Sequence, residues 1–126
     1  MAYKYLVNDR VEYRGIACIG FVISGSVVHI QQIQGARHRQ EELRPLRWEK
    51  LLVKIVVEIA RQLRFKTVEI LPAERNDYYI PSDRYLKMRR STKKDWQKLL
   101  KLRYDVTAKR LGFKWNLEKQ VYEYIL

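Results

Sequence analysis

Three basic side chains surround a proline at the start of a long apolar segment. Arg44 precedes Pro45, and Arg47 and Lys50 follow it within about one turn. Proline is favoured in the first turn of a helix, because the N–H that it lacks would have no partner there. The first amides of a helix are unpaired and lie at the positive end of its dipole, so they attract anions and disfavour cations. The spacing therefore predicts a phosphate-sized anion site, with a solvated basic turn as the alternative.

Two carboxylates have positions suited to general base chemistry. Glu69 lies inside a β-rich run, and Glu74 lies just past the end of that run. A carboxylate in reach of a water or an amine can accept its proton. The alternative is that both are surface acids that offset nearby Arg and Lys residues. His29 is expected on the wetter face of its own strand.

A basic segment with interleaved aromatic residues is the third candidate. The chain has 26 basic and 14 acidic residues, a formal net charge of +12, which attracts polyanions. Cations that neutralise phosphates beside rings that stack on bases are typical of nucleic-acid binding. The cations are Arg84, Lys87, Arg89, Arg90, Lys93, Lys94, Lys98 and Lys101, and the rings are Tyr78, Tyr79, Tyr85 and Trp96. The alternative is an ordinary solvated helix face, on which Lys94, Lys98, Lys101 and Asp105 would lie together.

Composition limits the class of protein. A chain of 126 residues with 47% hydrophobic content predicts a single domain over residues 1–126. Its one cysteine, Cys18, excludes an internal disulfide and is expected to be buried, and no Cys/His spacing predicts a metal site. No signal peptide is recognisable, and no apolar run approaches the roughly 18 residues of a membrane span. We therefore expect a cytoplasmic protein that has no membrane partner.

Periodicity predicts an α+β (α/β) fold, with a mixed, mostly antiparallel sheet and two main helices. A helix over 45–63 has a wide apolar face that predicts packing against the sheet with little exposure. A second helix, over 93–111, begins after the N-cap Thr92 and ends at Gly112. The predicted strands are 11–23 and 27–34, joined by a turn at Gly25, then 65–71, 113–116 and 121–125. Residues 73–92 give a weak signal.

The order of these elements and three motifs resemble the GNAT superfamily of acyl-CoA-dependent N-acyltransferases, from Val11 to the C-terminus. The segment Arg44-Pro45-Leu46-Arg47-Trp48-Glu49, followed by Leu51-Leu52, is similar to the family's pyrophosphate-binding loop and helix start. The segment Val68–Asn76 is similar to its fifth strand with the asparagine that follows. The segment Ala108–Phe113 is similar to its Gly-Phe helix end.

The resemblance implies binding of acetyl-CoA and transfer of its acyl group to an amine. The amine would attack the thioester directly, while a strand amide polarises the carbonyl. The implied cofactor-binding residues are Arg44, Leu46, Arg47, Trp48, Lys50 and Asn76. The implied catalytic residues are Glu69, Glu74 and Tyr104, the last replacing a family tyrosine that aligns with Ala108 one turn further on.

A second hypothesis keeps the fold without the enzyme. Arg47 and Glu49 replace the small residues of the family's loop, and few residues precede Val11. A basic, non-catalytic module that binds nucleic acid or an acidic protein would account for these differences. Whether the chain is an enzyme, which amine it would acylate and whether it forms a homodimer are left open by the sequence.

Overall fold

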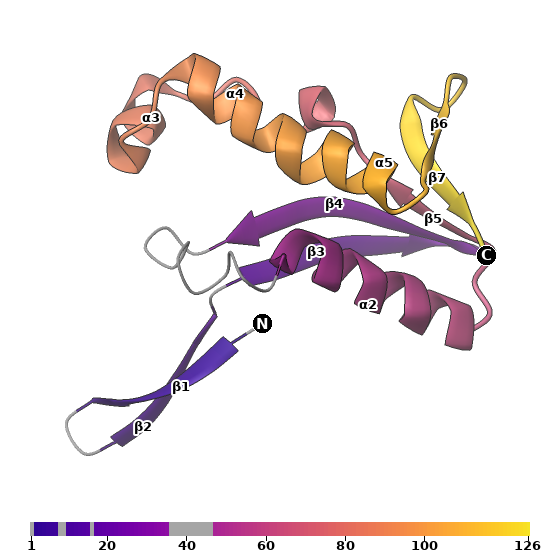
Figure 1. The fold of residues 1–126 in the computed structure, drawn as a ribbon, viewed down its shortest axis with the longest axis horizontal. Helices are drawn as coiled ribbons and strands as arrows, with labels where there is room; N and C mark the ends of the chain where they lie inside the picture. Colours follow the sequence, from indigo (N-terminus) through magenta and orange to yellow (C-terminus); the bar gives the residue numbers. More distant parts are fainter. Residues whose placement is uncertain (1, 8–9, 16, 36–46) are drawn as a thin grey trace.

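A five-stranded sheet is the centre of the fold (Figure 1). The computed structural model describes residues 2–7, 10–15, 17–35 and 47–126. The strands of the sheet are β3 (Ala17–Ser24), β4 (Val27–Gly35), β5 (Thr67–Ile70), β6 (Lys114–Asn116) and β7 (Val121–Ile125). Their order is β3-β4-β5-β7-β6, and only β4 and β5 run parallel. The prediction of a mixed, mostly antiparallel sheet with helices is therefore confirmed.

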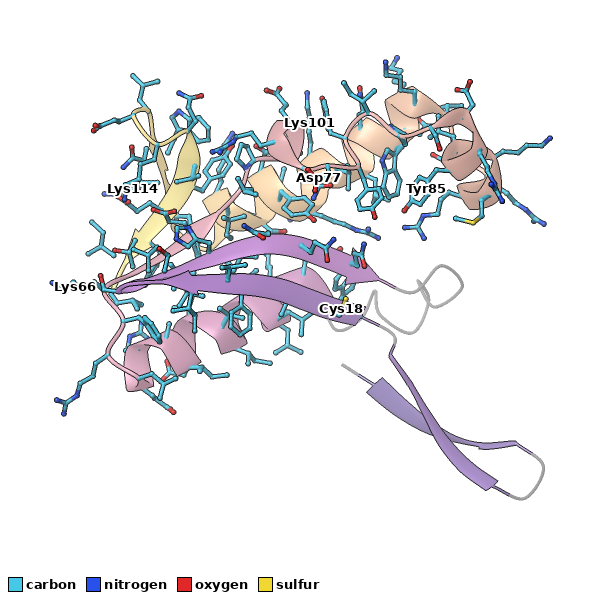
Figure 2. All side chains as sticks on the ribbon, turned by 180° about the vertical axis from the view of Figure 1, so that it is seen from behind. Cys18, Lys66, Asp77, Tyr85, Lys101 and Lys114 are labelled. Carbon is cyan, nitrogen blue, oxygen red and sulfur yellow. The ribbon has the colours of Figure 1, made fainter. Side chains whose placement is uncertain are left out.

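The two main helices pack on one face of this sheet. Figure 2 views the sheet from behind, so that β3 and β4 lie in front of the first of these helices. The helical elements are α2 (Trp48–Gln62), η2 (Ala73–Arg75), α3 (Asp83–Arg89), α4 (Lys93–Lys101), η3 (Leu102–Val106) and α5 (Thr107–Arg110). The last three follow one another directly as one long helix. No helix in the described part of the chain is long and apolar enough to cross a membrane.

Strand alternation explains the one-sided core. Val28 and Ile30 of β4, and Val68 and Ile70 of β5, are at most 3% exposed and belong to the hydrophobic core. Successive side chains of a strand point to opposite faces, so Glu69 points away from the helices. The core consequently lies between the sheet and α2, α4, η3 and α5.

A β-bulge in β4 explains its imperfect alternation. Gly20 of β3 pairs with Gln32 of β4. The next residue, Phe21, pairs with Ile30, so β4 contains one extra residue at this point. An extra residue reverses the faces of the side chains beyond it. Ile33 is therefore fully buried although it is out of phase with Ile30.

Several element boundaries and exposures differ from the predictions. The predicted strand 11–23 is divided between β2 (Arg10–Gly15) and β3, and β2 pairs with an unpredicted β1 (Ala2–Val7) in a separate antiparallel hairpin. The first helix is seen from Trp48, and the predicted residues 45 and 46 lie outside the described residues. The weak segment 73–92 contains η2 and α3. Cys18 is exposed, so its predicted burial is wrong.

The first helix is also more exposed than predicted. The spacing of Leu51, Ile55, Ile59 and Leu63 places them along one side of α2, and all four are classed as exposed. The expectation of little exposure is wrong for these residues, because the sheet covers only the adjacent stripe that includes Leu52, Val56 and Ala60.

The second long helix contains a π-helical turn. Thr92 caps it as predicted, since its Oγ1 accepts a hydrogen bond from Asp95 N (3.1 Å). The turn η3 then adds a residue to the helical repeat and rotates the remainder of the helix about its axis. The sequence predicted that Asp105 would share the solvated face of Lys94 and Lys98. This prediction is wrong. Asp105 is half-buried and hydrogen-bonded inside the fold.

Two helix ends adopt the same C-terminal motif with different residues. In α2, Phe65 N donates to Ala60 O (2.9 Å) around Arg64, which has a φ of 62°. After α5, Phe113 N donates to Ala108 O (3.0 Å) around Gly112, which has a φ of 85°. This six-to-one hydrogen bond with a left-handed residue is a Schellman motif, in which glycine is favoured because it lacks a Cβ.

Reciprocal substitutions at these two positions should have opposite effects on stability. Arg64→Gly is expected to raise the free energy of unfolding by roughly 0.5–1 kcal/mol, and Gly112→Ala to lower it by about 1 kcal/mol. A Cβ at residue 112 would lie 3.8 Å from Tyr124 Cε2, an ordinary contact, so the backbone conformation alone sets the cost. Urea denaturation measures both, and changes of the same sign would contradict the argument.

Candidate functional site

An open groove lies between the start of α2 and the second half of the long helix. Its volume is about 580 Å³. One wall is lined by residues Arg47, Trp48, Glu49 and Lys50 of α2 and its N-cap, and the other by Leu102, Val106, Thr107 and Arg110. Trp48 is buried at the base of α2 and does not fill this space. The helix start predicted from the sequence as an anion site therefore borders a groove.

The amides at the helix start have no acceptor within the helix. The first turn of α2 is closed by a hydrogen bond from Leu51 N to Arg47 O (3.2 Å), so the amides of residues 48–50 have no acceptor within the helix. Among the described residues no side chain caps the helix, and Arg47 adopts a left-handed conformation with a φ of 47°. Amide groups at a helix start with no capping side chain are suited to an anionic ligand.

The electrostatic environment of the groove favours an anion. Partial burial and the nearby charges of Arg110, Arg47 and Lys54 lower the pKa of Lys50 from its ordinary value. These cations repel one another, and an anion between them would relieve the repulsion. Glu49 is the one acid among the described residues that line the groove, and it opposes an anion.

A second feature lies where β4 and β5 separate. Their pairing ends at Ile30 and Ile70, and Tyr104 reaches the backbone of β4 beyond that point. The Tyr104 hydroxyl accepts hydrogen bonds from Ile33 N (2.9 Å) and Asn76 Nδ2 (2.9 Å). Burial raises the pKa of Tyr104, so it keeps its proton at neutral pH. A strand amide and a protonated phenol therefore meet at one point.

Asp105 connects this point to the rest of the fold. Its Oδ2 accepts a hydrogen bond from Ala73 N (3.1 Å), and its Oδ1 accepts one from the Tyr122 hydroxyl (2.7 Å). Burial and the bond to Asp105 raise the pKa of Tyr122. The carboxylate thus holds η3 against η2 and β7 and fixes the position of Tyr104 beside it.

The two tyrosines should make the fold sensitive to alkali. The pKa values of Tyr104 and Tyr122 are raised above the ordinary value of 10.0. Their contribution to the free energy of unfolding is therefore fully present below pH 10 and is lost as the pH rises above it. Urea denaturation between pH 8 and 10.5 should show a falling free energy of unfolding. The fall should be smaller in Tyr122→Phe, and an identical slope in that variant would contradict this assignment.

The predicted bases do not face the groove. Glu69 lies on the opposite face of the sheet, where its Oε2 is 2.8 Å from His29 Nδ1 and its Oε1 is 3.1 Å from Lys119 Nζ. It is only 5% exposed, so the alternative is wrong in placing it at the surface, but Glu69 does offset the charge of a lysine as that alternative expected. His29 is half-buried in this pair, which fits the expected wetter face. Glu74 is an exposed residue of η2.

Four residues of the basic segment border a second open hollow. This hollow, of about 550 Å³, is lined by Lys93, Lys94, Lys98 and Lys101 together with Tyr79 and Gln97. Arg84, Lys87 and Arg90 are exposed. Arg89 differs from them, because its guanidinium lies over the rings of Tyr85 (5.7 Å) and Trp96 (5.0 Å). Trp96 is buried and cannot serve as a stacking platform for bases.

The structure thus brings together only part of the predicted site. Arg47, Trp48 and Lys50 line the groove, and Asn76 bonds to Tyr104, whereas Arg44 and Leu46 lie outside the described residues. The site predicted from the sequence did not include Arg103, Arg110 or the amide of Ile33. Arg103 had a detectable signal, since it falls in the apolar stripe of its helix, where a charged residue is unexpected.

Comparison with known proteins identifies no relative. No family model matches the chain, and no curated protein and no solved structure matches it. Among the described residues, no group of three or more His, Cys, Asp or Glu side chains could hold a metal ion. Assignment of a function therefore depends on the geometry of the groove and on the contacts of Tyr104.

Proposed function

We propose that the chain binds acyl-CoA in the groove beside α2 and transfers the acyl group to an amine. The observation that carries this proposal is the juxtaposition of Arg47, Lys50 and Arg110 with the amides at the start of α2, which no described side chain caps. Arginine pairs bidentately with phosphate, and helix amides donate to its remaining oxygens. The sequence resemblance to N-acyltransferases supports the same ligand.

The contacts of Tyr104 support a transfer step. In this step the amine nitrogen attacks the thioester carbonyl carbon, a C–N bond forms and the C–S bond breaks. The Ile33 N–H would exchange its bond to the Tyr104 hydroxyl for one to the developing oxyanion, which a strand amide can stabilise. Tyr104 would protonate the departing thiolate and regain its proton from solvent, and the attacking amine would lose its proton to water. Glu69 is given no part in this step, because it lies across the sheet.

Isothermal titration with acetyl-CoA and CoA tests the binding proposal. Arg47→Gln and Arg110→Gln should each weaken binding about tenfold, corresponding to about 1.4 kcal/mol. Lys109→Gln is the matched control, since Lys109 is exposed, adjacent to Arg110 and not part of the groove lining. We expect its affinity to stay within about twofold of the original chain. Absence of CoA binding, or an equal loss in the control, would refute the proposal.

The lysine hollow favours a second candidate function, binding of nucleic acid or another polyanion. Four lysines from α4 line it, with Tyr79 among them. Cations spaced along a helix can lie along a phosphate backbone, and their affinity then depends steeply on salt.

Fluorescence anisotropy with single-stranded RNA and DNA at several salt concentrations tests this second function. The triple variant Lys94→Gln, Lys98→Gln, Lys101→Gln should reduce the slope of log affinity against log salt by roughly 0.7 per lost phosphate contact. A control variant removes the same charge from exposed positions outside the hollow, through Lys66→Gln, Lys109→Gln and Lys114→Gln. Equal slopes in the two variants would show that binding depends on net charge alone and not on the lysine hollow.

The other partners named from the sequence stay predictions. These are the amine acceptor, an acidic protein and a second copy of the chain, together with the cytoplasmic location.

A further inference from the structure

Arg103 is a buried cation with no ionic partner among the described residues. It is 2% exposed, and in that part of the chain its Nε has no hydrogen-bond partner. Its guanidinium carbon lies 5.2 Å from the centre of the Trp48 ring. Glu49 is near enough to act on it electrostatically, but burial and the like charge of Arg89 act in the opposite direction and lower its pKa.

This arrangement is unfavourable unless an anion completes it. Removing a charged side chain from water is costly, even after the surroundings relax. A cation–π contact with Trp48 is favourable but supplies no negative charge to offset that of the guanidinium. Buried charges in proteins are normally paired with an opposite charge, so Arg103 has the environment of a residue that awaits a negatively charged group.

A small cavity joins Arg103 to a second arginine and to the contact point of Tyr104. The cavity has a volume of about 20 Å³, roughly the space of one water molecule. Arg103 and Arg89 line it, with Tyr104, Ile33 and Asn76 beside them. Gln32 and Gln34 of β4 also line it, as do the aromatic residues Tyr78, Tyr85 and Trp96. No Asp or Glu is among the described residues that line it. Two arginines and several neutral polar residues therefore line a space that fits one oxygen of a carboxylate.

We propose that Arg103 and Arg89 bind a carboxylate of the substrate beside Tyr104. The carboxylate would belong either to the acceptor amine, as in an amino acid, or to the acyl chain, as in a dicarboxylic acyl group. A guanidinium recognises both in the same way, through paired N–H donors. Carboxylate binding stands on the cavity alone, whereas its place in the reaction rests on the proposed acyl transfer.

Arg103→Met is the informative variant. Methionine has a similar length and can remain on the Trp48 ring, and replacing an unpaired buried charge with an apolar side chain is often neutral or stabilising. The variant should therefore fold. Arg84→Met is the matched control, because Arg84 is exposed and lies outside the cavity.

Thermal unfolding with acetate and succinate, compared with chloride at equal ionic strength, tests carboxylate binding without any turnover. Carboxylates should raise the melting temperature of the original chain and of Arg84→Met more than chloride does. Arg103→Met should lose this difference. An equal carboxylate effect in Arg103→Met, or none in the original chain, would overturn the inference.

Transfer assays then separate the two sources of the carboxylate. Acetyl-CoA with glycine is compared with acetyl-CoA and glycinamide, and succinyl-CoA is tested with glycinamide. Dependence on Arg103 only with glycine places the carboxylate on the acceptor, and dependence only with succinyl-CoA places it on the acyl group. If carboxylates stabilise the fold through Arg103 but no substrate turns over, the anion site stands and the proposed acyl transfer fails.

Discussion

Tyr104→Phe is expected to lower the free energy of unfolding by about 2–4 kcal/mol, because two donors lose their acceptor at once. The lost bonds come from the backbone of Ile33, which is fully buried, and from the side chain of Asn76. Each unsatisfied buried donor costs roughly 1–3 kcal/mol. Phenylalanine keeps the ring in place, so packing should contribute little. Urea denaturation measures the change.

Tyr79→Phe is the control for this substitution. Tyr79 packs against the same core, and its hydroxyl has no hydrogen-bond partner in the part of the chain that is described. Its replacement should change the free energy of unfolding by less than about 0.5 kcal/mol. A loss in Tyr104→Phe no larger than in this control would show that water replaces the hydroxyl, and that the bonds to Ile33 and Asn76 contribute little.

Asp105→Ala should have the second large effect, also about 2–4 kcal/mol. The substitution leaves the amide of Ala73, which is fully buried, and the hydroxyl of Tyr122 without their acceptor. Because these bonds hold η3 to η2 and β7, the loss should be accompanied by weaker protection of the Ala73 amide in hydrogen exchange.

Asp77→Ala separates this effect from a general change of charge. Asp77 is exposed, and removing its carboxylate raises the net charge by the same amount. It should have nearly the original stability. If both variants lose equal stability, the cause would be repulsion among the cations of this basic chain. Loss of the two hydrogen bonds would then not explain the effect.

Periodicity and capping predicted most of the architecture. The two long helices have apolar stripes at three- and four-residue spacing, and Thr92 and Gly112 determine where the second one begins and ends. Local signals of this kind depend only on neighbours in the chain, so a sequence reveals them. The turn at Gly25, with a φ of 58°, was predictable for the same reason.

Tertiary contacts account for the features that the sequence did not reveal. The π-helical turn rotates Asp105 inward, and a simple helical projection cannot include that rotation. The bulge in β4 places Ile33 in the core. The pattern of apolar residues in the sequence indicated only that this strand is irregular. The groove itself joins Lys50 to Arg110 across sixty residues of sequence. No spacing rule connects residues so far apart.

The outer strand β3 determines how the protein should behave at high concentration. It forms one end of the strand order, and its Phe21, Val22 and Ile23 are each about half exposed. In the described part of the chain, Phe21, Val22 and Ile23 have a strand partner on one side only, and such an outer strand can pair with another molecule. The net charge of +12 keeps molecules apart at low ionic strength, and added salt screens that repulsion. Solubility should therefore decrease as salt increases, and a lysine in place of Val22 should weaken this dependence.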